Sequence, residues 1–229
     1  MNGILTMPST PRFRTGRFGL RSNTVTFVSP LSGATQTLEL PGTKWLATYE
    51  LPPMFRAEAE EWLAFLASLN GRAGRFYAGD PNGIVPRGVG GGTPVVAGAN
   101  QRGRTLTVSG FSGSNPVLLK GDYVAWDTPT GWRELHKLTA DAPTLGVGGY
   151  DEGGYDIGGY GGGGSTELAI TPAIRESPAD GATLILANAS CVMMLAQDDS
   201  AMWDINEATN YGIKFNAEEV FIANVSLVS

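Results

Sequence analysis

The chain is short of the residues that build disulfides and metal sites. Its 229 residues include one cysteine and one histidine. A single cysteine excludes an internal disulfide framework, and one cysteine with one histidine is too few for a structural zinc site. Cys191 lies in the apolar run Cys-Val-Met-Met-Leu at 191–195. We therefore predict that it is a small, buried hydrophobic side chain.

Long hydrophobic runs are also missing. No stretch approaches the ~20 apolar residues that a membrane-spanning helix needs. The N-terminal sequence MNGILTMPSTPRFRTGRF lacks the apolar core of a signal peptide. The sequence therefore predicts synthesis in a cytoplasm and no membrane partner.

No catalytic motif is recognisable. His136 follows Glu134 by two residues in a predicted strand, but no Gly-x-Ser-x-Gly elbow accompanies it. A packed, hydrogen-bonded histidine explains this pair more simply than a catalytic base with a serine partner. The glycine-rich span 88–98 is predicted to be a loop. Its glycines precede neither a Lys-Ser or Lys-Thr pair nor a helix, so they do not form a phosphate-binding loop. We predict a protein that is not an enzyme and uses no cofactor or metal ion.

Paired acids do not change this expectation. Asp198-Asp199 and Glu218-Glu219 are each adjacent in sequence. Adjacent residues of a strand face opposite sides, and this geometry does not suit the two carboxylates of a glycosidase.

Charge is sparse and unevenly distributed. Charged residues make up 17% of the chain, and the net charge is −6. Residues 1–104 carry 11 lysines and arginines and 6 acids, whereas residues 105–229 carry 5 and 16. Such asymmetry can guide contacts between copies of a subunit, with the basic half of one meeting the acidic half of the next. The alternative is two solvated surfaces that have no common role.

Glycine and proline are abundant, with 32 and 14 residues beside an ordinary 42% of hydrophobic residues. This composition is typical of short strands joined by many turns. Alternating residues predict strands at 24–28, 35–40 and 45–51. Because tight turns separate them, we expect these three strands to form an antiparallel meander.

One amphipathic helix is predicted at about 54–70. The double proline at 52–53 ends the preceding strand. Apolar side chains then recur at helical spacing: Phe55, Ala59, Trp62, Leu63, Leu66 and Leu69. Gly71 suits the left-handed position after the helix. The glutamates at 58, 60 and 61 are explained as a solvated face that matches the helix dipole.

Short strands continue to the C-terminus, with turns about every 8 to 12 residues. They are predicted at 74–78, 104–108, 132–138, 168–174, 183–186, 191–195 and 220–228. The segment 117–126 is predicted to be two strands with a Gly-Asp corner between them. The predicted fold class is mainly β with one α-helix, as a split β-barrel or β-sandwich of antiparallel strands. The side chains expected to hold the helix on the sheet are Trp45, Tyr49, Trp62, Leu66 and Phe76. The predicted parts are an arm at 1–16, the meander with its helix at 17–112, and barrel strands at 113–229.

The N-terminal arm is basic, and Arg12, Arg14 and Arg17 lie near two prolines with no acid among them. We predict that these arginines contribute to an interface. Binding of nucleic-acid phosphates is the alternative, but interleaved aromatic residues are lacking and the whole chain is acidic.

A Gly/Tyr-rich insert occupies 146–164, GVGGYDEGGYDIGGYGGGG, and repeats Gly-Gly-Tyr. Glycine of this density is costly to order, which favours a flexible loop tip. Alternatively, Tyr150, Tyr155 and Tyr160 become ordered against a neighbouring subunit or ligand. Its acids, Asp151, Glu152 and Asp156, could bind a hard cation such as calcium, but they lack the spacing of a calcium-binding repeat.

Two sets of short motifs occur in order along the chain. The first runs through Trp45, Tyr49-Glu50-Leu51-Pro52, the helical Glu61-Trp62-Leu63-Ala64-Phe65-Leu66, Asn70-Gly71, Phe76 and Asp80-Pro81. The second is Gly121-Asp122-Tyr123, Leu135-His136-Lys137-Leu138 and Ile170-Thr171-Pro172-Ala173-Ile174-Arg175. Together they span most of residues 18–200 and resemble the distal tail, or tail-tip, proteins of long-tailed bacteriophages. The Gly/Tyr-rich insert departs from that pattern.

The resemblance implies a virion structural protein at the tip of a phage tail. Such a protein forms a closed ring, of six copies by resemblance, around a DNA channel and joins the tail tube to the baseplate or tail fibre. Its implied partners are further copies of itself and the adjacent tail-tube, tape-measure and baseplate hub proteins. DNA would only pass through the channel, past an acidic lumen that does not retain it.

Two other functions remain open from the residues. A host-receptor or carbohydrate-binding tail module would need exposed aromatic side chains, for which the three insert tyrosines, Trp126 and Trp132 are candidates. A cell-wall hydrolase would depend on His136 and Glu134.

Overall fold

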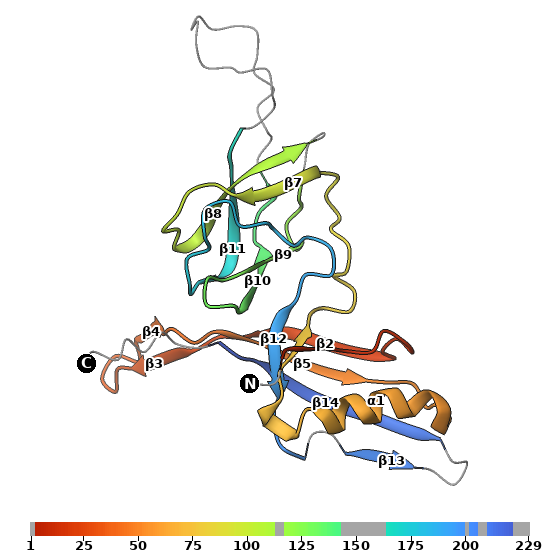
Figure 1. Ribbon diagram of the computed structural model, residues 1–229. Helices are drawn as coiled ribbons and strands as arrows, with labels where there is room; N and C mark the ends of the chain where they lie inside the picture. Colours follow the sequence, from red (N-terminus) through yellow and green to blue (C-terminus); the bar gives the residue numbers. More distant parts are fainter. Residues whose placement is uncertain (1–2, 113–116, 143–163, 200–201, 206–209, 222–229) are drawn as a thin grey trace, which may run out of the picture. The chain divides into compact units, whose positions relative to one another are not determined.

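The computed structural model describes residues 3–112, 117–142, 164–199, 202–205 and 210–221. Within these ranges the chain is mainly β with one α-helix, and its antiparallel sheets include one that curls into a half-barrel (Figure 1). The predicted fold class is therefore confirmed. Contacts divide the chain into two units. Unit 1 comprises Met1–Ala78 and Val192–Ser229, and unit 2 comprises Gly79–Cys191.

Unit 1 is built on a sheet with seven strands among the described residues. The order is β1 (Leu5–Thr6), β6 (Phe76–Ala78), β12 (Cys191–Leu195), β14 (Tyr211–Glu219), β5 (Lys44–Glu50) and β2 (Thr15–Arg21), and β13 (Trp203–Ile205) also pairs with β14. β1 and β6 run parallel. The pairs that β14 makes with β12, β13 and β5, and that β5 makes with β2, are antiparallel.

The helix α1 (Arg56–Ser68) covers one face of this sheet (Figure 1). Aromatic side chains of the helix and the sheet are in contact there. Trp62 lies 6.2 Å from Phe215 between ring centroids, and Tyr49 lies 5.4 Å from Phe215. β5 alternates along its length, so that every second side chain is buried toward the helix. The predicted clamp is confirmed: Trp45, Tyr49, Trp62, Leu66 and Phe76 are all buried.

The N-terminal segment is anchored to this cluster. The ring of Phe13 stacks on Tyr49 at 4.5 Å and meets Trp62 edge-on at 5.4 Å. The indole Nε1 of Trp62 donates a hydrogen bond to the carbonyl oxygen of Thr10 at 3.1 Å. The expected arm at 1–16 therefore contributes a side chain to the core of unit 1, and its residues from Thr15 onward belong to β2.

The helix ends differ slightly from the prediction. Phe55, expected on the buried face, precedes α1 in extended backbone and is 67% exposed, so this expectation is wrong. Met54 is buried instead and bridges to Tyr211, because the backbone stays extended after the double proline. The left-handed position directly after the C-cap Leu69 is taken by Asn70 at φ +50°, not by Gly71 as predicted. Gly71 follows it with φ +65°, and a Cβ there would lie 2.6 Å from Oδ1 of Asp198.

The predicted meander is wrong. β3 (Thr24–Val28) and β4 (Thr35–Glu39) form a two-stranded sheet of their own in the described chain. β2 pairs with β5, which follows β3 and β4 in the sequence. The four strands thus make one hairpin nested inside another. Local alternation shows that these segments are strands, but it does not say which segment each one pairs with.

Unit 2 contains a five-stranded antiparallel sheet among its described residues. The order is β7 (Gly91–Val96), β8 (Gly103–Ser112), β11 (Thr166–Ile174), β10 (Arg133–Leu138) and β9 (Tyr123–Asp127). Register shifts interrupt the β7–β8 and β8–β11 pairs, and such irregularities bend strands. The sheet surrounds a core that includes Leu106, Phe111, Leu118, Trp126, Leu168 and Ile170.

Several strand predictions in unit 2 need correction. The glycine-rich span 88–98, expected to be a loop, contains β7, where Gly92 at φ +91° and Gly110 at φ +83° fit the irregular register. Residues 117–119 lie outside any strand, and 183–186 contributes only isolated bridges at Thr183 and Ile185.

The division into units also differs from the predicted boundary near residue 112, which falls within unit 2. The chain enters unit 2 after β6 and returns to unit 1 with β12, so that unit 1 is discontinuous. At the C-terminus, β14 ends at Glu219 and residues 222–228 of the last predicted strand lie outside the described residues.

Candidate assembly surface

The hairpin β3–β4 is closed at both ends by hydrogen bonds. At the tip, the backbone N–H of Ser29 donates to the carbonyl of Ala34, and that of Gly33 donates back to the carbonyl of Ser29, each at 2.9 Å. At the base, Leu40 N–H donates to the Asn23 carbonyl, and Asn23 Nδ2 donates to the Pro41 carbonyl, each at 2.7 Å. These contacts make the hairpin a direct continuation of the β2–β5 pair (Figure 1).

One face of this hairpin is apolar and uncovered. Val25 lies opposite Leu38, and Phe27 lies opposite Gln36, so these side chains share a face. Val25, Phe27 and Leu38 are 52%, 62% and 63% exposed. The opposite face carries mainly threonines, and Leu31 at the tip is also exposed. The ribbon is thus amphipathic, although no described part of the chain covers its apolar face.

The sequence contains a signal for this surface that the prediction of a meander did not use. Residues 22–43 include one charged residue, Glu39. A solvated hairpin ordinarily carries more charge, whereas depletion of charge together with exposed apolar residues is typical of interface cores. The uncovered apolar face therefore marks the hairpin as a contact surface.

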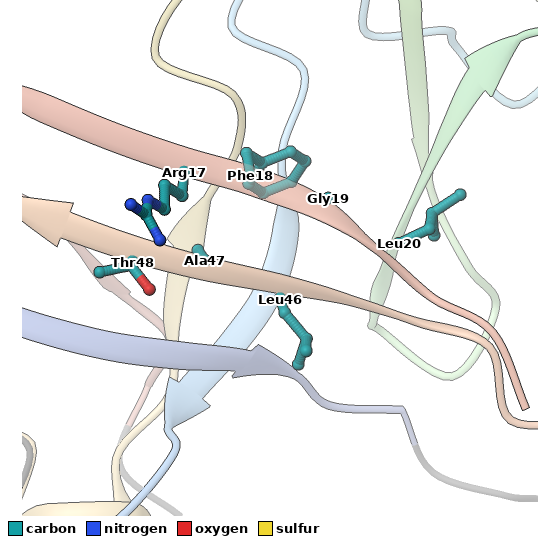
Figure 2. A pocket seen from close by; sticks show the side chains of 7 residues that line it. All are labelled: Arg17, Phe18, Gly19, Leu20, Leu46, Ala47 and Thr48. Atoms are coloured by element: carbon teal, nitrogen blue, oxygen red, sulfur yellow. The ribbon is translucent and has the colours of Figure 1, made fainter.

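Beside the hairpin, β2 forms one edge of the unit 1 sheet. Gly19 lies opposite Leu46, and Arg17 lies opposite Thr48. These residues, with Phe18, Leu20 and Ala47, line an open depression of about 300 Å³, shown in Figure 2. A Cβ at Gly19 would meet no atom within 4 Å, so the missing side chain leaves the floor of the depression open.

The three predicted interface arginines are exposed but do not form one cluster. Arg17 lines the depression, with its side chain beside Thr48 (Figure 2). Arg14 lies before β2, and its Nη1 is 3.9 Å from Oε1 of Glu50. Arg12 is exposed and precedes Phe13, which is half-buried. Of the three, Arg17 is the one that the structure places at the candidate surface.

His136 and Glu134 form a buried pair on β10. The imidazole Nε2 lies 3.1 Å from Oε2 of Glu134, and Nδ1 donates to the carbonyl oxygen of Pro172 at 2.8 Å. The indole of Trp126 stacks on the imidazole at 4.3 Å. His136 is 0% and Glu134 4% exposed, so a substrate has no access to them. The predicted packed, hydrogen-bonded histidine is confirmed.

Backbone donors hold the charge of Glu134. The N–H of Glu176 donates to Oε1 at 2.8 Å, and the N–H of Arg175 donates to Oε2 at 3.2 Å. Burial raises the pKa of this carboxyl, but the hydrogen bond and charge of His136, with the two backbone N–H groups, outweigh burial and lower its pKa below the ordinary value. The pair is thus a buried hydrogen-bonded contact that ties β10 to the end of β11.

The lowered pKa of Glu134 predicts a loss of stability in acid. A carboxyl whose pKa is lower in the folded state stabilises the fold above its unfolded pKa of about 4.3, and this contribution disappears as the pH falls through the folded pKa. We expect the difference in free energy of unfolding between the wild type and Glu134→Gln to be larger at pH 5 than at pH 3. Urea unfolding at both pH values measures it. A difference that does not shrink in acid would contradict the assignment.

The aromatic candidates for a carbohydrate site are not brought together. Trp126 is fully buried against His136, so it offers no face to a sugar. Trp132 is half-buried. The insert residues Tyr150, Tyr155 and Tyr160, with the acids at 151, 152 and 156, lie outside the described residues, and their roles stay predictions.

Asp122, which belongs to the Gly121-Asp122-Tyr123 motif, has a structural role. It is 4% exposed. Its carboxylate accepts hydrogen bonds from the backbone N–H groups of Arg87, Gly88 and Leu119 at 2.9, 3.0 and 2.9 Å. It therefore ties two separate loops together. The Gly-Asp corner was visible in the sequence, but the distant donors were not.

The paired acids and the cysteine that were considered as candidate site residues have structural roles. Glu218 pairs with Lys44 and Arg72, whereas Glu219 is buried and accepts from the backbone N–H of Trp45. These adjacent acids have separate roles, as expected. Cys191 is buried, which confirms its prediction. The described ranges contain no group of three potential metal ligands and no helix long and apolar enough to cross a membrane.

The charge asymmetry between the two halves of the sequence does not become a charge difference between the two units. Unit 1 combines 9 lysines and arginines with 11 acids, and unit 2 combines 7 with 11. Lys44 and Arg72 from the basic half meet Glu218 from the acidic half inside unit 1. The basic and acidic halves of the sequence are therefore not two oppositely charged units.

The sequence matches no protein-family profile and no curated protein.

Proposed function

We propose that this chain is a non-enzymatic structural subunit of a bacteriophage tail tip, where copies of it assemble into a closed ring that joins the tail tube to the baseplate or tail fibre. The observation that carries the proposal is the uncovered apolar face of β3–β4. Isolated two-stranded hairpins are marginally stable in water, and exposed apolar patches rimmed by polar residues mark contact sites. A partner that covers this face would stabilise the hairpin and bury its side chains together.

A contact between the hairpin and a different surface of the next subunit would be compatible with a ring. The hairpin continues one end of the β2–β5 pair, so it can reach a different surface of a neighbour (Figure 1). Contacts between unlike surfaces of identical subunits close into rings when the rotation permits. The resemblance of the chain to distal tail proteins adds the location, and it adds tail-tube, tape-measure and baseplate hub proteins as neighbours.

The chemistry of the chain suits passage of DNA without binding. Both units carry more acids than bases, and phosphate binding depends mainly on lysine and arginine. The buried state of His136 and Glu134 leaves the hydrolase alternative without an accessible acid–base pair.

The test has two parts that use the full chain. Light scattering after size exclusion and native mass spectrometry are expected to give a single multiple of the 24.1 kDa chain mass. Cryo-electron microscopy of purified particles is expected to place the protein as a ring at the end of the tail tube. A monomer in solution combined with the absence of the protein from particles would overturn the proposal.

A further inference from the structure

The outer edge of β4, on the side away from β3, is an open pairing surface of unit 1. β3 and β4 form a two-stranded sheet among the described residues, and β14 ends beside the start of β5. We propose that residues 222–228 of the same chain bind this edge of β4 as a third, antiparallel strand. The inference goes beyond the proposed function, because the contact lies within one chain and needs no ring.

Backbone groups of two threonines point to this edge. The hydrogen bonds at the tip and base of the hairpin join Ala34 and Leu40 to β3. Because hydrogen bonding to one neighbour alternates along an antiparallel strand, the even-numbered residues of β4 bond to β3. The N–H and C=O groups of Thr35 and Thr37 therefore point the other way. Among the described strands only β3 pairs with β4, so the edge is open to a further strand.

The course of β14 leads to the same edge. β14 pairs with β5 on the side opposite β2. Because the hairpin continues the β2–β5 pair (Figure 1), β3 extends β2 and β4 extends β5. The place beside β4 that corresponds to β14 is therefore its outer edge. β14 runs antiparallel to β5 and reaches Glu218 opposite Leu46, so the chain leaves β14 in the direction of β4.

The segment after β14 has the composition of a strand that suits this hairpin. Residues 220–228, VFIANVSLV, include no charged residue, no proline and no glycine, and their β-branched side chains favour extended backbone. Val225 and Leu227 alternate with polar residues. A strand formed by this segment would therefore have one apolar and one polar face at its centre, as the hairpin itself does.

Matching these faces defines the register. Val225 shares the apolar face of the hairpin when it lies opposite Leu38. Residues 224–228 then lie beside the whole of β4, which is also five residues long. The added strand would supply partners for the backbone groups of Thr35 and Thr37. It would widen the apolar face without covering it, so that the face stays available to another subunit.

This register differs by one residue from that of the β14–β5 ladder, in which Glu218 lies opposite Leu46. Two irregularities lie where the shift is needed. The carboxylate of Glu219 accepts a hydrogen bond from the backbone N–H of Trp45 at 3.0 Å, and Gly42, between β4 and β5, has φ +109°. Such local irregularities change the register of neighbouring strands.

The covalent link to β14 favours this segment over a separate chain as the occupant. A short tether gives a binding segment an effective concentration in about the millimolar range. The gain for the hairpin is also clear, because two strands alone are marginally stable in water whereas three strands with an apolar face are not.

Disulfide trapping in the full chain tests this contact. In the proposed register Leu38 and Val225 form a non-hydrogen-bonded pair, whose Cα atoms lie about 4.5 Å apart, within the range of a disulfide. The variant Leu38→Cys/Val225→Cys, oxidised with copper phenanthroline, is expected to form an intramolecular disulfide. Mass spectrometry of the digested, unreduced protein identifies the linked peptides. Leu38 is 63% exposed, so its replacement should leave the fold intact.

Thr37→Cys/Val225→Cys is the matched control. Thr37 precedes Leu38 and lies on the opposite face of the hairpin, so this pair of thiols should stay reduced. A mixture of the single variants Leu38→Cys and Val225→Cys tests whether the segment binds its own chain, and it should give no cross-linked dimer. Cys191 is buried, so it contributes little background.

Hydrogen exchange tests the backbone ladder without a disulfide. A third strand protects the amides of Thr35 and Thr37, which a two-stranded hairpin leaves open to water. Ser226→Pro removes a donor to β4 and should raise their exchange rates about tenfold, the effect of one lost hydrogen bond. Leu227→Pro is the control, because the N–H of residue 227 would point away from β4. It should change the rates by less than about twofold, since proline is tolerated at the outer side of an edge strand.

The outcomes separate this inference from the proposed function. A folded double variant without the intramolecular disulfide, or wild-type amides at 35 and 37 that exchange as fast as in an unstructured peptide, would overturn the third strand and leave the ring proposal standing. Dimers from the mixed single variants would give the edge to a second copy and also overturn the inference. A monomer that is absent from particles but forms the intramolecular disulfide would overturn the ring and support the third strand.

Discussion

Replacing Trp62 by alanine is expected to lower the free energy of unfolding of unit 1 by about 3 to 5 kcal/mol, the range for a large aromatic side chain lost from a core. Trp62 is 1% exposed. Its ring contacts Phe13, Phe65 and Phe215, and its indole N–H holds the N-terminal segment through Thr10. The variant therefore leaves a cavity and releases that segment. Urea unfolding, with hydrogen exchange of peptides from β5 and α1, measures the loss.

Phe55→Ala is the matched control for this prediction. Phe55 immediately precedes the same helix but is 67% exposed. Its truncation should change stability by no more than about 0.5 kcal/mol, as is usual for surface sites. Equal losses in the two variants would show that the aromatic cluster is not the main contact between α1 and its sheet.

Removing His136 is expected to destabilise unit 2 by about 3 to 5 kcal/mol, because a large ring is lost from a core and a buried carboxylate loses a hydrogen-bond partner. His136→Ala leaves the carboxylate of Glu134 without its nearest donor and opens a gap beside the stacked Trp126. The carbonyl of Pro172 also loses its hydrogen bond. Hydrogen exchange of peptides from β9, β10 and β11 should report faster exchange in the variant.

Two further variants separate the causes. His136→Phe keeps a ring against Trp126 but provides no donor, so it should retain the packing and lose the hydrogen bonds to Glu134 and Pro172. Thr139→Ala, just beyond the end of β10 and exposed, should change stability by no more than about 0.5 kcal/mol. If His136→Phe is as stable as the wild type, the pair contributes through packing alone.

The local elements of this fold are predictable where local chemistry decides them. The helix follows from the spacing of Trp62, Leu66 and Leu69, and the left-handed backbone at its end begins at Asn70, one residue before the predicted Gly71. The error at Phe55 arose because helical spacing continues into a segment that the double proline keeps extended. Likewise, the glycines at 92 and 110 suggest a loop, yet they serve an irregular strand pair.

The candidate surface was only partly predictable. Its strands were expected, and Arg17 was named as an interface residue, but the hairpin and the depression were not. Val25, Phe27 and Leu38 alternate in the way that core residues do, and nothing in their spacing tells that no sheet lies over them. The opening over Gly19 depends on its cross-strand neighbour Leu46, which lies in β5.

The sequence by itself determined the mainly β class, the single helix, the buried roles of Cys191 and His136, and the absence of a recognisable catalytic motif, because each depends on composition or on short-range patterns. Only the tertiary structure decided which strands pair, how β12 and β14 return to complete unit 1, and which apolar residues stay exposed. These are properties of contacts between segments far apart in the chain. Their pairing is set by the register and packing of the whole sheet, which no single segment encodes.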